Sequence, residues 1–458
     1  MPTDFILVRC SVLLLSLSEQ KEAHMSIMND FSKTFFDNMW NWQDFAVKYN
    51  FAIYDASLQA YMSLFGQNRP TQAKKIENVV RASFDSNLRK SLVQEDFATS
   101  LERFIDTFSD IASFSKHNII HKYFDDVYER LNFFIEPLRE SINRTPSEII
   151  EMDGRFDLLH YKSPIPVKHK TPILVVGSLI NRYYILDLLP KISIIKKLQE
   201  NGFDVYVTDW RTPHSFDKDL TLDKYAHEYV EKAVDKISEV NGSEKITLFG
   251  YCWGGIFSLI YSALHPERVK NLILHATPAD LEIKPTSIEL WAKKMNADKL
   301  VKVFGNIPGQ FLNMAFLMRN PIEAALKYVR FFGQPRTMSE MMQFVAIEDW
   351  LYDSRPIIGN VFQKIIDDIY KNNLLIKNKM KVGGKLVDLK KITMPLLNIV
   401  GEKDDLVPPQ SSKSINGMVS SKDKNLIEFP TGHVGLCISA SAHEKLWPEV
   451  ITWLTERS

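Results

Sequence analysis

Three features are scarce in this chain, and each scarcity argues against a class of protein. The 458 residues include only three cysteines, Cys10, Cys252 and Cys437, which are too few for a disulfide framework and favour a reducing compartment. Lysine plus arginine number 56, as do aspartate plus glutamate, so no charge excess favours nucleic acid or an anionic membrane as the main partner. The apolar stretch of residues 5–17 is shorter than the roughly 20 residues of a membrane-spanning helix.

Motifs for metals and cofactors are absent from the sequence as well. Histidine and cysteine do not recur at the spacing of a metal site, and there is no glycine-rich phosphate loop. We therefore expect no metal site and no redox cofactor.

The first 144 residues divide into two parts. Residues 1–25 are expected to be disordered or a misassigned start, with Met25 or Met28 as the alternative first residue. Across residues 26–144, apolar side chains recur every three or four positions, as at Phe31, Phe35 and Met39. This spacing predicts helices with one apolar face, and therefore a helical N-terminal region.

From residue 145 onward, short β-branched runs alternate with helical stretches. Such apolar runs are typical of parallel strands that are buried on both faces. The alternation predicts a doubly wound α/β domain with a mostly parallel sheet. Strands are expected at residues 173–176, 205–208, 246–249, 272–274, 396–400 and 426–429.

One long segment interrupts this alternation. Residues 283–389 contain no convincing core strand and are rich in methionine, phenylalanine and tryptophan, which predicts helices joined by loops. We therefore assign residues 145–282 and 390–458 to the α/β core and residues 283–389 to an insertion. The insertion is either a cap over an active site or a helical subdomain with no gating role, and the sequence leaves both open.

A nucleophile is predicted where strand 246–249 meets helix 256–264. The connecting turn, residues 250–255, reads GYCWGG. Such a turn holds the side chain at its tip above the carboxyl end of the sheet, and small residues two before and two after it relieve crowding. The dipole of the following helix favours a thiolate at its N-terminus. Cys252 is therefore the expected nucleophile, and a buried structural cysteine is the alternative.

An acid and a base follow in the order that α/β hydrolases use, nucleophile, acid, histidine. Asp404 and Asp405 both follow strand 396–400, and either could accept the imidazole N–H. His433 lies in a glycine-flanked loop after strand 426–429, where the base belongs. A base is needed because a free cysteine, with a pKa of about 8.5, is mostly protonated near neutrality. Cys437 is interpreted as a packing residue.

Further sequence blocks carry a family resemblance that extends from residue 145 to the C-terminus. Together with the cysteine turn, they resemble the polyhydroxyalkanoate synthases, especially the class III catalytic subunit. Two departures stand out: the family usually has histidine at the position of Asp405, and Trp253 is unusual after the cysteine. The blocks are residues 181–188 (NRYYILDL), 202–210 (GFDVYVTDW) with Pro213, Thr277 and Pro278 with Asp280, 305–308 (GNIP), 348–353 and 404–409.

The resemblance implies an acyltransferase of the α/β-hydrolase fold with an acyl-cysteine intermediate. It places the nucleophile on Cys252, the histidine on His433 and the aspartate on Asp404, with Asp405 as the alternative. The expected oxyanion hole consists of backbone N–H groups of Trp253 and of Ser178 or Leu179.

The implied substrate is (R)-3-hydroxyacyl-CoA, short-chain as in 3-hydroxybutyryl-CoA, and the implied product is a polyester with release of CoA. Acyl-CoA is then a substrate, and no cofactor is needed. The implied partners are the growing polyester chain or granule and a second copy or accessory synthase subunit, at the granule surface in the cytoplasm. The N-terminal region is either a packing domain or a surface for such partners. Two other functions stay open: a hydrolase of the same fold, such as a polyester depolymerase, and a non-catalytic granule-associated protein.

Overall fold

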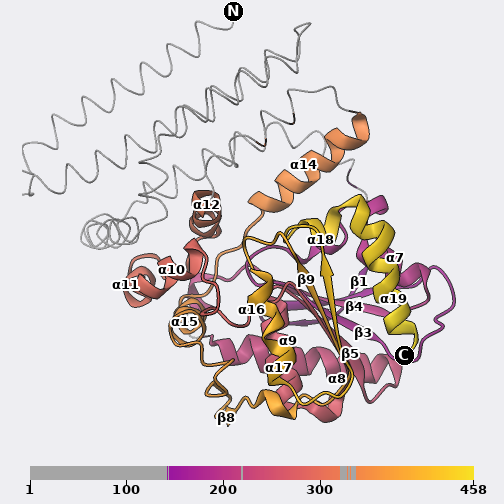
Figure 1. Cartoon of the computed structure of the whole chain (residues 1–458), viewed down its shortest axis with the longest axis horizontal. Helices are drawn as coiled ribbons and strands as arrows, with labels where there is room; N and C mark the ends of the chain where they lie inside the picture. The colour runs from indigo at the N-terminus through magenta and orange to yellow at the C-terminus, as the bar shows by residue number, and fades with distance from the viewer. Residues whose placement is uncertain (1–141, 143, 218–219, 320–326, 328–330, 332–336) are drawn as a thin grey trace, which may run out of the picture.

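The computed structural model describes residues 142, 144–217, 220–319, 327, 331 and 337–458 (Figure 1). The expected disordered start, residues 1–25, lies outside the described residues, as does nearly all of the expected helical region, residues 26–144. Within the described part of the chain, no helix is both long enough and apolar enough to span a membrane.

The core is one eight-stranded sheet with the order β1-β2-β4-β3-β5-β6-β9-β10. Strands β4, β3, β5, β6, β9 and β10 pair in parallel, whereas β1, β2 and β4 pair antiparallel. All six expected strands are present, and the doubly wound, mostly parallel sheet is confirmed. The strands are β1 (Glu148–Asp153), β2 (Phe156–Tyr161), β3 (Ile173–Val176), β4 (Val205–Trp210), β5 (Ile246–Tyr251), β6 (Val269–His275), β9 (Leu396–Gly401) and β10 (Lys424–Phe429).

The sequence interpretation missed the hairpin β1–β2, which extends the sheet at one edge. Strand β1 has no buried residue, while five of the six residues of β2 are buried. The turn between β1 and β2 includes Gly154 at a φ of +55°, a conformation that favours glycine. Neither strand shows a long apolar run, since β1 lies at the edge of the sheet and three of its six residues are charged.

Helices cover both faces of the sheet, with α7 and α19 on one face and α8, α9 and α16 on the other (Figure 1). The apolar core therefore forms on both sides of the parallel strands. The helices of the core are α7 (Ile194–Glu200), α8 (Val230–Asn241), α9 (Trp253–Leu264), α16 (Pro409–Lys413), α17 (Ile415–Met418), α18 (Gly435–Ile438) and α19 (Trp447–Thr455). Shorter turns are η1 (Tyr183–Leu186), η2 (Pro190–Ile192), η3 (Ser215–Asp217), the π-helical η4 (Lys224–Tyr229), η5 (Pro266–Arg268), η7 (Leu389–Lys391) and the π-helical η8 (Ala442–Leu446).

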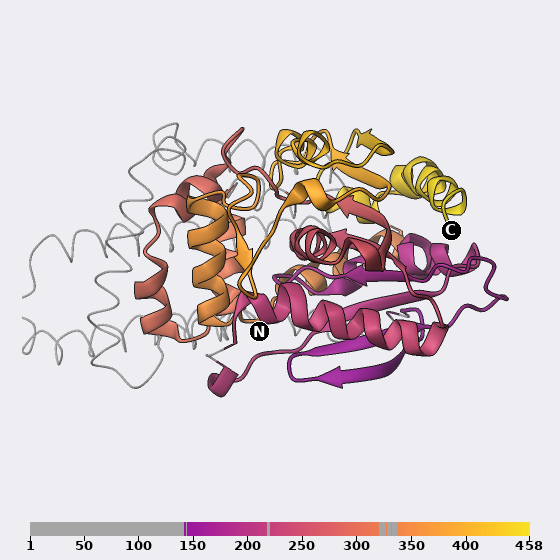
Figure 2. The ribbon, with the colours of Figure 1, turned by 90° about the horizontal axis from the view of Figure 1, so that it is seen from below.

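The segment between β6 and β9 contributes no strand to the main sheet. Its helices lie beside the sheet, and both views show α10, α11 and α15 grouped there (Figures 1 and 2). A short hairpin, β7 (Lys381–Val382) with β8 (Lys385–Leu386), forms a separate two-stranded sheet. The helices are α10 (Ser287–Lys294), α11 (Ala297–Phe304), α12 (Gly309–Arg319), α14 (Met338–Tyr352), α15 (Gly359–Lys364) and the π-helical η6 (Ile365–Lys371).

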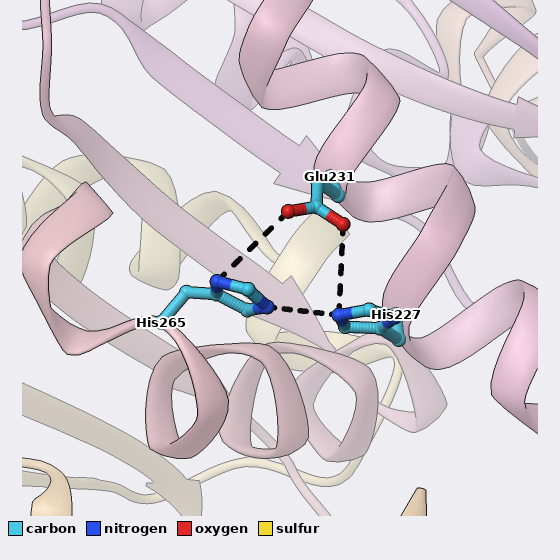
Figure 3. A group of neighbouring side chains, drawn as sticks. All are labelled: His227, Glu231 and His265. Atoms are coloured by element: carbon cyan, nitrogen blue, oxygen red, sulfur yellow. Dashed lines mark hydrogen bonds and ion pairs between the residues drawn. The ribbon is translucent and has the colours of Figure 1, made fainter. Parts of the chain in front are cut away.

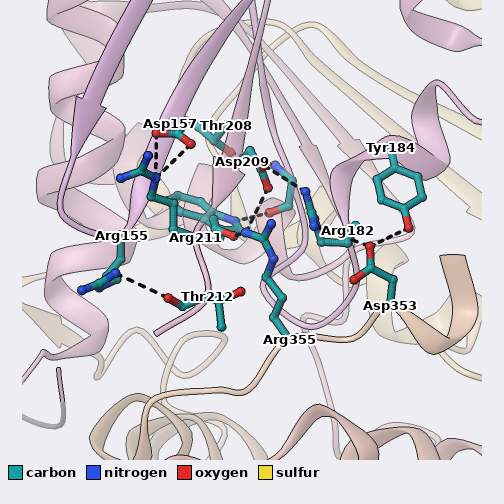
Figure 4. Close-up of polar contacts among 12 residues, drawn as sticks. Arg155, Asp157, Arg182, Tyr184, Thr208, Asp209, Arg211, Thr212, Asp353 and Arg355 are labelled. Atoms are coloured by element: carbon teal, nitrogen blue, oxygen red, sulfur yellow. Dashed lines mark hydrogen bonds and ion pairs between the residues drawn. The ribbon is translucent and has the colours of Figure 1, made fainter. Parts of the chain in front are cut away.

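A partly buried polar network connects this insertion to the core (Figure 4). Asp209, at the end of β4, accepts hydrogen bonds from Arg182 at 3.0 Å and from Arg355 of the insertion at 3.4 Å. The Tyr184 hydroxyl donates to Asp353, also of the insertion, at 2.7 Å. Burial raises the pKa of Asp209, and the two guanidinium groups oppose that shift. Three of the blocks that carry the family resemblance therefore meet in one network, although they lie far apart in the sequence.

Candidate active site

The cysteine lies on a strained turn between β5 and α9. Cys252 has a φ of 52° and a ψ of −117°, which a non-glycine residue adopts only when its surroundings impose it. Its N–H donates to the carbonyl of His275 on the neighbouring strand β6 at 2.8 Å. A Cβ at Gly254 would lie 1.9 Å from the Val176 carbonyl oxygen, and a Cβ at Gly250 would lie 2.4 Å from the Cα of Gly255. The glycines therefore let the helix start pack directly against the ends of β3 and β5.

The expected base and one of the two candidate acids form a buried pair. His433 Nδ1 lies 2.7 Å from Asp404 Oδ2, and their side chains are 7% and 1% exposed. The other carboxylate oxygen, Oδ1, accepts the backbone N–H groups of Leu406 at 3.0 Å and Val407 at 2.8 Å. Backbone N–H groups therefore hold one oxygen of the Asp404 carboxylate, and the other oxygen pairs with the imidazole of His433.

The neighbouring Asp405 points elsewhere. Its side chain is 65% exposed and forms an ion pair with Arg319 of α12 at 2.5 Å. Of the two competing aspartates, the fold therefore brings Asp404 to His433 and directs Asp405 toward the insertion.

The electrostatics of the site favour a charged imidazole. Burial by itself would lower the pKa of His433, but the Asp404 carboxylate, the charge of Cys252 and hydrogen bonds to both raise it to about 10. These interactions stabilise the protonated form of the His433 imidazole. The sulfur is only slightly accessible, since Cys252 is 8% exposed.

The second buried cysteine, Cys437, is not part of the His433–Asp404 pair. Cys437 is fully buried, and burial raises the pKa of its thiol well above the ordinary range. A thiol held in its protonated form is a poor nucleophile. The geometry therefore agrees with the interpretation of Cys437 as a packing residue.

The expected oxyanion-hole residues lie on the two segments that meet beside the cysteine. Trp253 is the first residue of α9, where a backbone N–H has no partner within the helix. Ser178 and Leu179 follow β3 directly, one and two residues beyond Gly177, and the carbonyls of Val176 and Gly177 press against Gly254. These three N–H groups stay a prediction, since their role depends on a bound thioester.

The insertion reaches the cysteine turn itself. The Trp253 side chain is buried, and its ring stacks on that of Tyr370 from η6 with centroids 6.0 Å apart. Burial is the main cause that raises the pKa of Tyr370, and Glu289 and Cys252 add to that shift. This contact places the insertion next to the nucleophile turn.

Sequence reasoning missed one histidine of the site, His275 at the end of β6. It is fully buried among aromatic rings, with centroids 5.1 Å from Tyr251 and 5.4 Å from Trp447. Neither ring nitrogen has a hydrogen-bond partner within the described residues. Burial, reinforced by His433, lowers the pKa of His275 to about 3, so the ring is neutral. Its position at the carboxyl end of a core strand was the available signal.

The sheet order and the cysteine turn define a protein of the α/β-hydrolase fold, and the family model described as "alpha/beta hydrolase fold" matches residues 171–437. A model described as "Poly-beta-hydroxybutyrate polymerase (PhaC) N-terminus" matches residues 133–198. The "Poly(3-hydroxyalkanoate) polymerase subunit PhaC" of Haloferax mediterranei is 40% identical over 321 residues, which is 69% of this chain and 65% of that protein. The protein of the same name from Allochromatium vinosum is 37% identical over 316 residues, 68% of this chain and 89% of its own length. The chain therefore belongs to the poly(3-hydroxyalkanoate) polymerase family.

These relatives confirm the fold and the family that the sequence blocks indicated. They also support the expected class of enzyme, an acyltransferase of polyhydroxyalkanoate synthesis, over a hydrolase.

Proposed function

We propose that this chain polymerises short-chain (R)-3-hydroxyacyl-CoA into a polyester, with release of CoA through an acyl-cysteine at Cys252. One observation carries the proposal: in a member of the polymerase family, Cys252 sits on a strained turn beside a buried His433–Asp404 pair. This set of groups supports nucleophilic catalysis on a carbonyl carbon.

The first half-reaction transfers the acyl group to the enzyme. His433 takes the proton of Cys252, and the thiolate attacks the thioester carbonyl. The oxyanion that forms accepts hydrogen bonds from the N–H of Trp253 and of Ser178 or Leu179. The carbon–sulfur bond to CoA then breaks, and CoA leaves with the proton that His433 returns. Because one thioester replaces another, the step is close to balanced in energy.

The second half-reaction lengthens the chain. The hydroxyl of another hydroxyacyl unit attacks the acyl-cysteine, His433 accepts the hydroxyl proton, and an ester bond forms as the Cys252 sulfur leaves. Asp404 supports both steps by stabilising the imidazolium. Its second oxygen already accepts two backbone N–H groups, which favours an orienting role over direct contact with the substrate.

The remaining parts of the proposal concern partners and location. The acyl transfer needs no metal or redox cofactor, because the reacting groups all belong to the protein and the acyl-CoA. The relatives are named as subunits of the polymerase, which supports an accessory subunit or a second copy as partner. The polymer product supports a location at the surface of a cytoplasmic granule.

The test is CoA release from (R)-3-hydroxybutyryl-CoA and from a medium-chain homologue, with analysis of the product. Cys252→Ala is expected to abolish CoA release, whereas Cys437→Ala, which removes a fully buried thiol, is expected to retain most of it. Unchanged turnover in Cys252→Ala would overturn the assignment of the nucleophile. Free hydroxy acid in place of polymer would identify a hydrolase instead.

A further inference from the structure

A group of three side chains far from the cysteine brings potential metal ligands together. His227 lies in the π-helical turn η4, Glu231 lies one turn later in α8, and His265 ends α9 (Figure 3). The spacing of histidine and cysteine in the sequence predicted no metal site. Only the packing of η4 and α8 against α9 places His265 beside the other two residues.

The ligand atoms of this group converge. One atom from each of the three residues lies within 4.8 Å of the other two. His227 Nε2 lies 2.8 Å from His265 Nε2 and 3.6 Å from Glu231 Oε2. Two nitrogens bound to one tetrahedral zinc ion at about 2.0–2.1 Å would lie about 3.3 Å apart, so the two rings need to separate by only about half an ångström.

The surroundings favour ligation over a solvated cluster. The histidine side chains are 18% and 14% exposed and that of Glu231 is 35% exposed, which leaves room for water as a fourth ligand. A second carboxylate, Glu267, lies 3.5 Å from the other ring nitrogen of His265, Nδ1. A carboxylate at that nitrogen orients a metal-bound imidazole.

We propose that His227, Glu231 and His265 bind one divalent metal ion of the zinc class, with water completing the coordination. Two imidazoles and a carboxylate suit zinc better than calcium or magnesium, which prefer oxygen ligands alone. The ion joins the start of α8 to the end of α9, the helix whose first residue follows Cys252. At 12 residues, α9 separates the ion from the nucleophile by about 18 Å, so the ion is structural.

The experiment measures metal binding without reference to activity. The full chain carrying Cys252→Ala, which removes the thiol of the proposed active site, is stripped with a chelator and titrated with ZnCl₂ by calorimetry. The same protein is titrated with Co²⁺, whose visible absorption reports the geometry and the nitrogen ligands. His265→Gln and Glu231→Gln are then compared in this background. His214→Gln is the matched control, because its side chain is exposed and lies outside the group.

The parent protein is expected to bind one equivalent of Zn²⁺ at this site and to unfold at a higher temperature with zinc than without it. Each of the two ligand variants is expected to weaken binding by at least about tenfold and to lose the thermal shift, whereas His214→Gln retains both. Glu231→Gln keeps the size of a side chain that is 35% exposed, so it tests the ligand even where His265→Gln folds poorly. Equal zinc affinity in parent and ligand variants would overturn the proposal. So would a parent that binds no zinc, which would leave a direct imidazole–imidazole hydrogen bond.

Discussion

Replacement of one carboxylate oxygen by nitrogen, in Asp404→Asn, separates the roles of two adjacent aspartates. An asparagine oxygen can still accept the N–H groups of Leu406 and Val407, so the loop keeps its backbone hydrogen bonds. The amide nitrogen would instead face His433 Nδ1, where the carboxylate oxygen now lies 2.7 Å away. Because an amide N–H cannot accept the imidazole proton, the ring is driven toward the tautomer that cannot take the Cys252 proton.

The two substitutions differ in expected magnitude because the two ion pairs differ in burial. Loss of one partner from a buried, hydrogen-bonded charge pair costs about 3–5 kcal/mol. At about 1.4 kcal/mol for each tenfold in rate, Asp404→Asn should slow CoA release by roughly 10²- to 10⁴-fold. Asp405→Asn breaks a pair in which the aspartate is 65% exposed. Such pairs contribute about 0–1 kcal/mol, so the rate should fall by about fivefold at most.

The assay is the initial rate of CoA release from (R)-3-hydroxybutyryl-CoA across a range of pH, with circular dichroism to establish that both variants fold. Loss of the Asp404 carboxylate removes an interaction that raises the pKa of His433 from its ordinary value to about 10, so the profile of Asp404→Asn should shift to lower pH. Asp405→Asn should keep the wild-type profile. An equal or larger loss in Asp405→Asn, or nearly full activity in Asp404→Asn, would refute the assignment of the acid.

Two further predictions concern stability. The folded pKa of His275 is lowered to about 3 from 6.5, so below pH 6.5 the unfolded chain binds a proton that the folded protein rejects, and stability falls with acidification until about pH 3. His275→Phe fills the aromatic site with a ring that cannot be charged. Between pH 7 and pH 5, the free energy of unfolding measured in urea should therefore fall by about 2 kcal/mol less in this variant than in wild type. Equal decreases in the two proteins would contradict this. Gly254→Ala should destabilise by at least about 2 kcal/mol, because its Cβ would lie 1.9 Å from the Val176 carbonyl oxygen. Gly417→Ala, whose Cβ would meet nothing within 4 Å, should stabilise α17 slightly, and a similar loss in both variants would show that crowding is not the cause.

The parts of the site that depend on neighbouring residues in the chain were predictable from the sequence. A strand, a turn with glycines two residues before and after Cys252, and a helix are all local signals, and the local backbone geometry is what exposes a nucleophile. The placement of His433 after a late strand was predictable for the same reason. The strand β2 was not, because six residues with only a short apolar run do not distinguish a strand from a loop.

The sequence by itself therefore determined the class of fold, the nucleophile turn and the order of the acid and the base. Only the tertiary structure decided between Asp404 and Asp405, since adjacent residues share the same sequence signals while their side chains point in different directions. Only the tertiary structure also shows the buried, neutral His275 and the polar network around Asp209, because the residues of each come from distant segments of the chain. The same is true of the group formed by His227 and His265, because packing, and not spacing along the chain, sets the distance between their ring nitrogens.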